Sequence, residues 1–154
     1  MTANLFLDTS ILVHFLRESP IFHAVDKQLG LYRKGKMPFI SEVTVGEIFS
    51  LSIQMKWGAK RLSEMKKVLS LLKPIPISHD EIMQRYALLD AFSKNRHPEL
   101  PLPNSTTARK MGKNDLWIAA TASVLEATLL TTDNDFDHLS PRFFLVENVG
   151  KWQV

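Results

Sequence analysis

Five acidic residues stand where a folded chain could use their carboxylates together: Asp8, Glu47, Asp115, Asp133 and Asp135. Carboxylates gathered in one cleft repel each other, so they must be protonated or neutralised by a cation. Hard oxygen ligands of this kind select Mg²⁺ or Mn²⁺ rather than zinc. Such an ion can polarise a phosphate and activate water, and a second ion can steady the leaving oxygen. These residue types therefore favour phosphodiester hydrolysis.

Two short apolar runs predict buried strands that end in acidic residues. Residues 4–7 form a continuous apolar run, as expected of a parallel strand covered on both faces, and the run ends at Asp8. Residues 129–132 predict a second strand, which delivers Asp133 and Asp135 at its carboxyl end. Ligands of open α/β sheets bind at that edge, so we expect these acids to lie near one site.

A helix predicted over residues 116–125 brings a further acid to the same region. The segment is apolar on almost every side, which indicates a buried helix. Asp115 stands in its first turn, on the face that Ile118 and Ala122 continue at helical spacing. An acid that leads an inward-pointing face is a candidate site residue.

Helix capping is the simplest alternative role for two of the acids. Asp8 and Asp115 each stand at the predicted start of a helix, where a carboxylate can accept hydrogen bonds from free backbone N–H groups. Capping does not explain Glu47, which lies well inside a predicted helix. Glu42 falls in the first turn of that helix, where the helix dipole favours an acid. We therefore expect Glu47 to be the site residue and Glu42 to be structural.

The remaining elements alternate between strands and helices, which predicts a parallel α/β sandwich. Two further strands are expected at residues 38–40 and 143–146, and the proline-rich residues 74–77 can form only an edge strand or a connector. Helices are expected over residues 9–16, 22–32, 41–56 and 60–72, and after residue 78. Residues 95–113 are rich in proline, serine and threonine and predict an irregular loop, which should border the site because it leads into Asp115.

Composition places the chain among ordinary globular domains. The 154 residues, 17.6 kDa in mass, are 45% hydrophobic and 23% charged, which suits one domain over residues 1–154. No apolar run is long enough to span a bilayer, so we expect no membrane partner. The absence of cysteine excludes disulfides and thiolate metal sites, and a reducing cytoplasm fits. The net charge of +3 is compatible with a polyanionic partner.

Four strings in this order resemble the PIN-domain family, and in particular its VapC-type toxin ribonucleases of bacterial toxin–antitoxin pairs. They are LDTS at residues 7–10, ISEVTVGEI at 40–48, NDLWIAATA at 114–122 and LLTTDNDF at 129–136. The resemblance covers nearly the whole chain. It implies a three-layer α/β/α sandwich with a central, mainly parallel sheet, and a Mg²⁺- or Mn²⁺-dependent endoribonuclease. It also implies a homodimer, an RNA substrate and inhibition by a cognate antitoxin.

The same resemblance assigns roles to individual residues. The acids that match the family's metal-binding and catalytic positions are Asp8, Glu47, Asp115 and Asp133, and Asp135 matches a less constant acid after them. Thr9 and Thr132 match small hydroxyl residues that brace the carboxylates. The acids by themselves repel phosphate, so the basic residues before the Asp115 helix could guide RNA toward them: Arg109, Lys110 and Lys113. The loop before Asp115 is longer than expected in a compact member, which leaves the choice of substrate open.

Other readings of the sequence compete with this one. A phosphatase that forms an aspartyl-phosphate would want a second acid two residues after Asp8, where the chain has Ser10. A receiver-like domain would want a lysine after a late strand, and the sequence around Asp133 supplies none. A non-catalytic PIN domain is expected to have lost an acid, and none of the matching acids is missing. A nuclease that processes RNA without acting as a toxin remains open, as does the RNA that is cleaved.

Overall fold

The computed structural model describes residues 4–30 and 37–152. Its helices are α1 (Thr9–Leu16), α2 (Pro20–Leu29), α3 (Glu42–Gln54), α4 (Ala59–Leu71), α5 (Asp80–Ser93) and α6 (Lys113–Val124). Its strands are β1 (Leu5–Leu7), β2 (Phe39–Ser41), β3 (Lys73–Ile75), β4 (Thr128–Thr131) and β5 (Leu145–Asn148). Two short 3₁₀ turns, Asp137–Leu139 and Val149–Lys151, flank β5.

All pairs of neighbouring strands in the five-stranded sheet are parallel, in the order β3-β2-β1-β4-β5. The chain builds outward from β1 to β2 and β3, and then continues on the other side of β1 with β4 and β5. The order therefore reverses between β1 and β4, where Leu7 lies opposite Leu130. In open α/β sheets a crevice at the carboxyl ends of the strands forms at this reversal.

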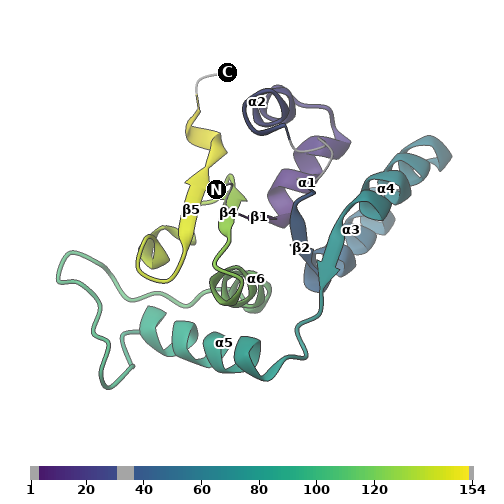
Figure 1. The fold of residues 1–154 in the computed structure, drawn as a ribbon. Helices are drawn as coiled ribbons and strands as arrows, with labels where there is room; N and C mark the ends of the chain where they lie inside the picture. The colour runs from purple at the N-terminus through teal and green to yellow at the C-terminus, as the bar shows by residue number, and fades with distance from the viewer. Residues whose placement is uncertain (1–3, 31–36, 153–154) are drawn as a thin grey trace.

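Helices cover both faces of the sheet, so the fold has three layers, α/β/α (Figure 1). Successive residues of a strand point to opposite faces. On β1, Phe6 belongs to the core shared with α5 and α6, and Leu7 belongs to the core shared with α1, α2, α3 and α4. Leu129 and Leu130 of β4 divide in the same way. The continuous apolar runs of the sequence are explained by this two-sided burial.

Helix α6 lies between the sheet and α5, as Figure 1 shows in green and teal. Ile118, Ala119, Ala120 and Ala122 are all fully buried, which confirms the prediction of a helix without a polar face. The alanines let the helix approach its neighbours closely, since a methyl group is the whole side chain. Among the described residues no helix, α6 included, is long and apolar enough to cross a membrane.

Several predicted boundaries were wrong by a few residues. The last strand runs over Leu145–Asn148, two residues later than predicted. Phe143 and Phe144 precede the strand instead of belonging to it: Phe144 is buried, and Phe143 packs edge-on against Phe92 of α5. The predicted helix over residues 22–32 begins earlier, at Pro20, and ends at Leu29, followed by Gly30 in the left-handed conformation. Residues 31 and 32 of that prediction lie outside the described residues.

The predicted loop before Asp115 is irregular from residue 94 to residue 112 and is fastened to the domain at several points. Leu102 and Met111 are buried in the core beneath α5 and α6. The backbone N–H of Leu102 donates to the side-chain oxygen of Asn95, and that of Arg109 donates to the carbonyl of Ser93 at 2.8 Å. The loop thus follows a definite path from the end of α5 to the start of α6.

Candidate active site

Asp8 is the most buried acid of the site, with 2% of its surface exposed. It follows β1 and caps α1, accepting a 2.8 Å hydrogen bond from the N–H of Thr9 on Oδ1. The hydroxyls of Thr131 and Ser10 donate to its Oδ2 at 2.7 and 3.1 Å. Burial, the larger cause, and the nearby charge of Asp133 together raise the pKa of Asp8 to about 6 in spite of these hydrogen bonds. Asp8 therefore caps α1 and also lies beside Asp133, so a capping role does not exclude a role in the candidate site.

Glu47 enters the site from the middle of α3. Its Oε1 accepts a 2.8 Å hydrogen bond from the hydroxyl of Thr9, which also lies 3.0 Å from the hydroxyl of Thr44. The first residues of α1 and the side chain of Glu47 are thereby tied together. Glu42, in the first turn of α3, accepts a hydrogen bond from the N–H of Ile77 at the exposed edge of the sheet. The two glutamates of one helix thus have different surroundings.

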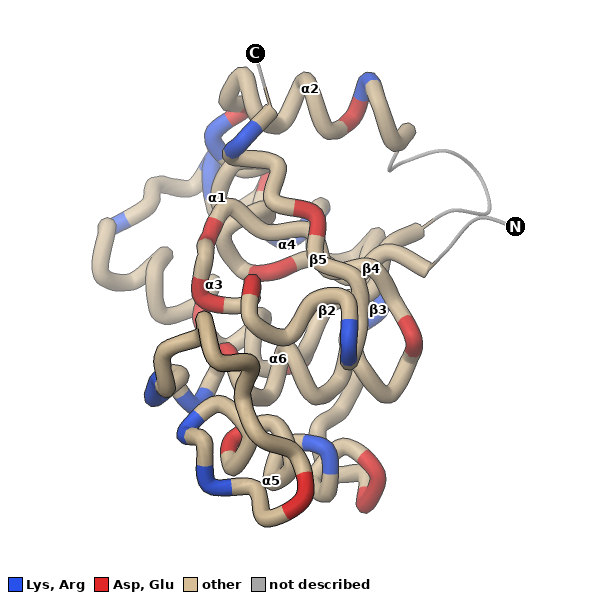
Figure 2. The backbone as a smooth tube through the Cα atoms, turned by 90° about the vertical axis from the view of Figure 1, so that its left-hand side faces the viewer, with Lys and Arg blue, Asp and Glu red and all other residues tan. Residues whose placement is uncertain are grey.

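Asp115 stands in the first turn of α6, which Gly112 precedes without a capping side chain. The helix-capping alternative for Asp115 is therefore wrong. Burial is the largest cause that raises the pKa of its carboxyl to about 7, and the charges of four other acids supply the rest of the rise: Asp8, Asp135, Asp133 and Glu47. Asp115 thus lies close enough to the other four acids singled out from the sequence to be affected by their charges. Figure 2 shows several acidic positions, in red, near one another around α1 and α3.

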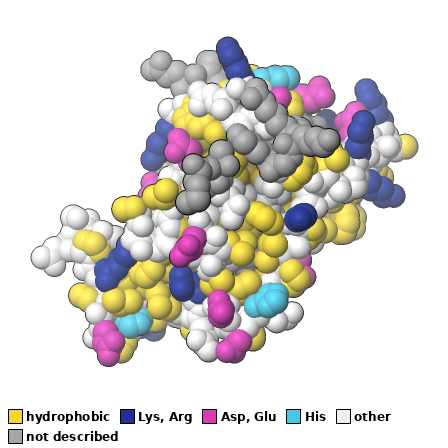
Figure 3. Space-filling view, viewed as in Figure 1, with side chains coloured by type: hydrophobic (Ala, Val, Ile, Leu, Met, Phe, Trp, Pro, Cys, Tyr) yellow, Lys and Arg dark blue, Asp and Glu magenta, His cyan; other side chains and the backbone are white. Residues whose placement is uncertain are grey.

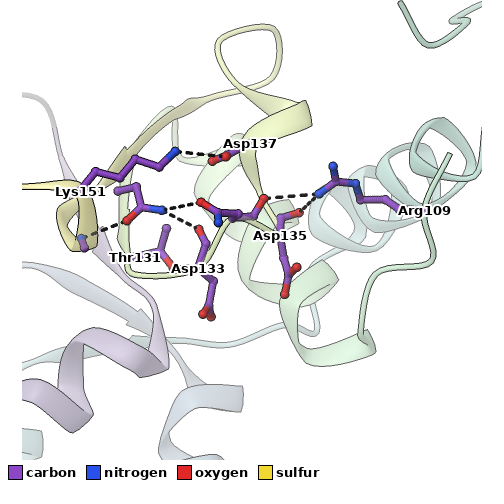
Figure 4. Close-up of polar contacts among 9 residues, drawn as sticks. Arg109, Thr131, Asp133, Asp135, Asp137 and Lys151 are labelled. Atoms are coloured by element: carbon purple, nitrogen blue, oxygen red, sulfur yellow. Dashed lines mark hydrogen bonds and ion pairs between the residues drawn. The ribbon is translucent and has the colours of Figure 1, made fainter. Parts of the chain in front are cut away.

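Asp133 and Asp135 occupy the turn that follows β4. The N–H of Asp133 donates to the hydroxyl of Thr131 at 3.0 Å, so one threonine side chain contacts both Asp8 and this turn. In Figure 4 the carboxylates of Asp133 and Asp135 point to the same side of the turn, whereas Asp137 turns away and pairs with Lys151 at 3.4 Å. Asp137 is therefore not part of the acidic cluster.

The bracing role that the resemblance gave to Thr132 belongs to Thr131. The strand ends at Thr131, whose fully buried side chain points toward Asp8, and only the backbone N–H of Thr132 takes part, donating to Ser10. Neighbouring side chains of an extended chain point in opposite directions. An error of one residue in the predicted end of the strand therefore selects Thr132 in place of Thr131 as the residue whose hydroxyl contacts Asp8. Sequence reasoning also missed Ser10 and Thr44, for which the only available signal is that short polar residues flank the acids.

A cleft of about 620 Å³ lies beside the acids. Thr9 and Glu47 line its end at the cluster, and Asn114 lines it from α6. Its floor follows one face of α3, formed by Val43, Gly46, Ser50, Leu51 and Gln54. Glu47 can therefore be reached from solvent along a mixed polar and apolar groove.

Two sets of basic residues are candidates for contact with RNA. Lys110 and Lys113 are exposed near the start of α6, whereas the guanidinium of Arg109 donates to the backbone carbonyls of Asn134 and Asp135, each at 3.4 Å. A separate basic surface lies over α4 in the right-hand part of Figure 3, formed by Lys60, Arg61, Lys66 and Lys67. An RNA contact by Lys110 and Lys113 stays a prediction.

The sequence matches the family model described as PIN domain over residues 5–140. The chain belongs to the PIN-domain family. Family membership supports a hydrolytic nuclease activity for this PIN domain, and the cluster of acids at the sheet edge suits it. Comparison with curated proteins gave no match.

Solved structures similar to this PIN domain include proteins of toxin–antitoxin complexes. A chain of VapBC2 from Rickettsia felis bound to a promoter DNA fragment superposes with a TM-score of 0.72 at 22% identity, covering 93% of this chain and 96% of that one. FitAcB from Neisseria gonorrhoeae gives 0.70 at 21% identity, with 96% and 99% covered. VapBC-1 from nontypeable Haemophilus influenzae gives 0.73 at 18% identity, with 96% and 98% covered. At these identities the likeness establishes the fold alone.

The donor chemistry of the cluster fits the divalent cation that the PIN-domain fold implies. Every acidic ligand offers oxygen, and a cation would relieve the repulsion that raises the pKa of Asp115. Within residues 4–30 and 37–152, no three histidine or acidic side chains stand close enough together to hold an ion unaided. Mg²⁺ is commonly held by one or two carboxylates with water and substrate phosphates as its other ligands, so an open set of carboxylates suits it.

Proposed function

We propose that this PIN domain is a divalent-metal-dependent endoribonuclease and the toxin of a toxin–antitoxin pair. It hydrolyses RNA phosphodiester bonds in the cytoplasm, with Mg²⁺ or Mn²⁺ as its cofactor. The residues that hold the ion and form the catalytic centre are Asp8, Glu47, Asp115 and Asp133. Asp135 adds negative charge beside them, and Thr9 and Thr131 orient the carboxylates.

The observation that carries this proposal is the convergence of acids from four separate segments at the reversal of strand order. Asp8 comes from the end of β1, Glu47 from α3, Asp115 from α6 and Asp133 from the turn after β4. Folding pays a free-energy cost to bury and crowd like charges, and a merely structural set of caps would not need to bring them together. A site that binds a cation and a phosphate explains this arrangement.

The chain's own residues prepare the site for that chemistry. A bound cation would polarise the phosphate and lower the pKa of the attacking water. Three donors from Thr9, Ser10 and Thr131 hold the carboxylate of Asp8 in one orientation and leave lone pairs on its oxygens for a ligand. Thr9 orients Glu47 at the end of the cleft. Thr9 and Glu47 both line the cleft, which gives an RNA strand access to them.

Cleavage of RNA by the purified protein should require added Mg²⁺ or Mn²⁺ and should stop when the ion is chelated. Asp8→Asn should bind the ion at least about tenfold more weakly, since even partners of metal ligands contribute this much. The measurement is a calorimetric Mn²⁺ titration of both metal-free proteins, together with cleavage of a mixed RNA pool. A wild-type protein that neither binds Mn²⁺ nor cleaves RNA would exclude the proposed function.

The proposed toxin role requires protein partners, and α3 offers a surface for one. Phe49 and Ile53, which lie four residues apart on α3, expose 46% and 77% of their surface, and Met55, directly after the helix, exposes 55%. Exposed apolar side chains that gather in one place mark interaction surfaces. We assign these exposed side chains to a homodimer contact. A cognate antitoxin is the second proposed partner. It is supported by the similar structures, one of which is a toxin–antitoxin complex from Klebsiella pneumoniae.

In light scattering the chain alone should have twice its 17.6 kDa mass. Ile53→Glu should shift this mass toward the monomer, because a charge would be buried at the contact. Met83→Glu is the control, since Met83 is also an exposed apolar residue but lies on α5. A wild-type monomer at micromolar concentration would contradict the homodimer. The antitoxin is tested separately, by whether the small protein encoded next to this gene suppresses cleavage.

A further inference from the structure

The turn that carries Asp133 and Asp135 has each of its three backbone carbonyls bound by a side-chain donor. The amide of Asn148 donates to the carbonyl of Asp133 at 3.2 Å and to the side-chain oxygen of Asn134 at 3.1 Å. The guanidinium of Arg109 donates to the carbonyls of Asn134 and Asp135. Figure 4 shows the guanidinium of Arg109 directed toward the turn. The backbone of the turn is therefore held between β5 and the loop before α6.

Arg109 is itself fixed at a buried point of the fold. Its backbone N–H donates to the carbonyl of Ser93, the last residue of α5, whose side chain is fully buried. The hydroxyl of Ser93 lies 2.7 Å from Nε2 of His138, which stacks on Phe92 just beyond the acidic turn. The C-terminal end of α5 thus contacts both the backbone of Arg109 and the side chain of His138, which follows the turn. A side chain anchored in this way can resist displacement of the turn.

Asn148 provides the matching anchor on the other side. It is the last residue of β5, which pairs with β4 in register, so that Asn148 lies opposite Thr131. Its side-chain oxygen accepts a hydrogen bond from the N–H of Gly150 at 3.0 Å, which orients the amide toward the turn. The donor end of Asn148 therefore has a defined direction before any ligand binds.

We infer that Arg109 and Asn148 are positioning residues that set the placement of the Asp133 and Asp135 carboxylates by holding the backbone of their turn. The inference rests on the proposed nuclease function, and it changes the role expected for Arg109. A guanidinium engaged by two carbonyls has fewer donors free for phosphate, whereas its neighbour Lys110 remains exposed. Residues that orient metal ligands commonly affect metal affinity or activity by about 10- to 100-fold.

The test compares Arg109→Ala, Arg109→Lys and Asn148→Ala with wild type. The control is Arg96→Ala, because Arg96 lies on the same loop and its side chain makes no hydrogen bond or ion pair with the described residues. Two properties are measured: hydrogen exchange of the peptide covering residues 132–137 in metal-free protein, and Mn²⁺ affinity by calorimetry. The kcat and KM for RNA cleavage are measured at several salt concentrations.

Arg109→Ala and Asn148→Ala should exchange faster over residues 132–137, bind Mn²⁺ about tenfold more weakly and have a lower kcat with KM nearly unchanged. Arg109→Lys should recover part of the loss, since an ammonium can still donate to one carbonyl. Arg96→Ala should match wild type in hydrogen exchange and Mn²⁺ affinity.

Unchanged hydrogen exchange in Arg109→Ala would overturn the inference. A raised KM with a flatter salt dependence and unaltered Mn²⁺ affinity would also overturn it, because this pattern identifies a phosphate contact. Lys110→Ala is expected to give that second pattern and serves as its reference. The exchange measurement needs no metal, so it separates failure of this inference from failure of the proposed function, which wild-type Mn²⁺ binding decides.

Discussion

Glu47→Gln is expected to lower the kcat for RNA cleavage by more than about 100-fold while leaving the fold intact. The substitution removes one negative charge from the site and keeps the volume of the side chain. Its amide oxygen can still accept the hydrogen bond from Thr9, so local packing is preserved. The loss should exceed the range of about 10- to 100-fold known for residues that only support a metal ligand.

Glu42→Gln supplies the matched control, because it makes the same chemical change on the same helix. Its amide oxygen can still accept from the N–H of Ile77, and the lost charge at the start of α3 should cost about 0.3–1 kcal/mol of stability. Cleavage by this variant should equal that of wild type. The two variants are compared by single-turnover cleavage and by urea unfolding. An active Glu47→Gln protein or an inactive Glu42→Gln protein would show that the site was placed on the wrong part of α3.

Asp115→Asn is expected to stabilise the metal-free protein at pH 8 although it impairs cleavage. The pKa of Asp115 is raised from its ordinary value of 3.8 to about 7, so the folded protein binds a proton more tightly than the unfolded chain. The free energy of unfolding therefore falls as pH rises from about 4 to about 7. Above pH 7 the cost of the charge is fully present, and removing it should recover about 1–3 kcal/mol after allowance for solvent screening.

Urea unfolding of both proteins in chelator at pH 8 and pH 5 measures this effect. The gain from Asp115→Asn should shrink at pH 5, where the wild-type carboxyl is already protonated in the folded state. Added Mn²⁺ should stabilise wild type more than the variant, since only ligands that bind the folded state contribute. Equal stability of the two metal-free proteins at pH 8 would contradict crowding of the acids. A gain of equal size at both pH values would point to the new amide rather than to the removed charge.

The order of the elements and the class of the fold were predictable because they depend on local patterns. Short runs rich in apolar residues indicated β1 and β4, and the helical spacing of apolar residues indicated α4 and α6. A parallel sheet then follows from the alternation of strands and helices. The boundaries of β4 and β5 could not be predicted to the residue, since apolar side chains such as Phe144 are buried both inside strands and beside them.

By itself the sequence determined which acids could share a site. Asp8 and Asp133 follow strands, and the carboxyl ends of parallel strands meet at one edge, so their approach is a consequence of chain order. Glu47 was separated from Glu42 by its depth in the helix, where an acid gains little from the helix dipole. Such inferences use only the neighbours of a residue along the chain.

Only the tertiary structure decided which groups hold those acids in place. The hydroxyl that contacts Asp8 belongs to Thr131, which is 123 residues away in the sequence. Arg109 lies 26 residues from Asp135, and its guanidinium donates to that residue's carbonyl. Hydrogen bonds require donor and acceptor to lie close together and nearly in line, and an error of one residue in strand register reverses the direction of a side chain. These partners are therefore fixed by the packing of the sheet and helices, which no local pattern encodes.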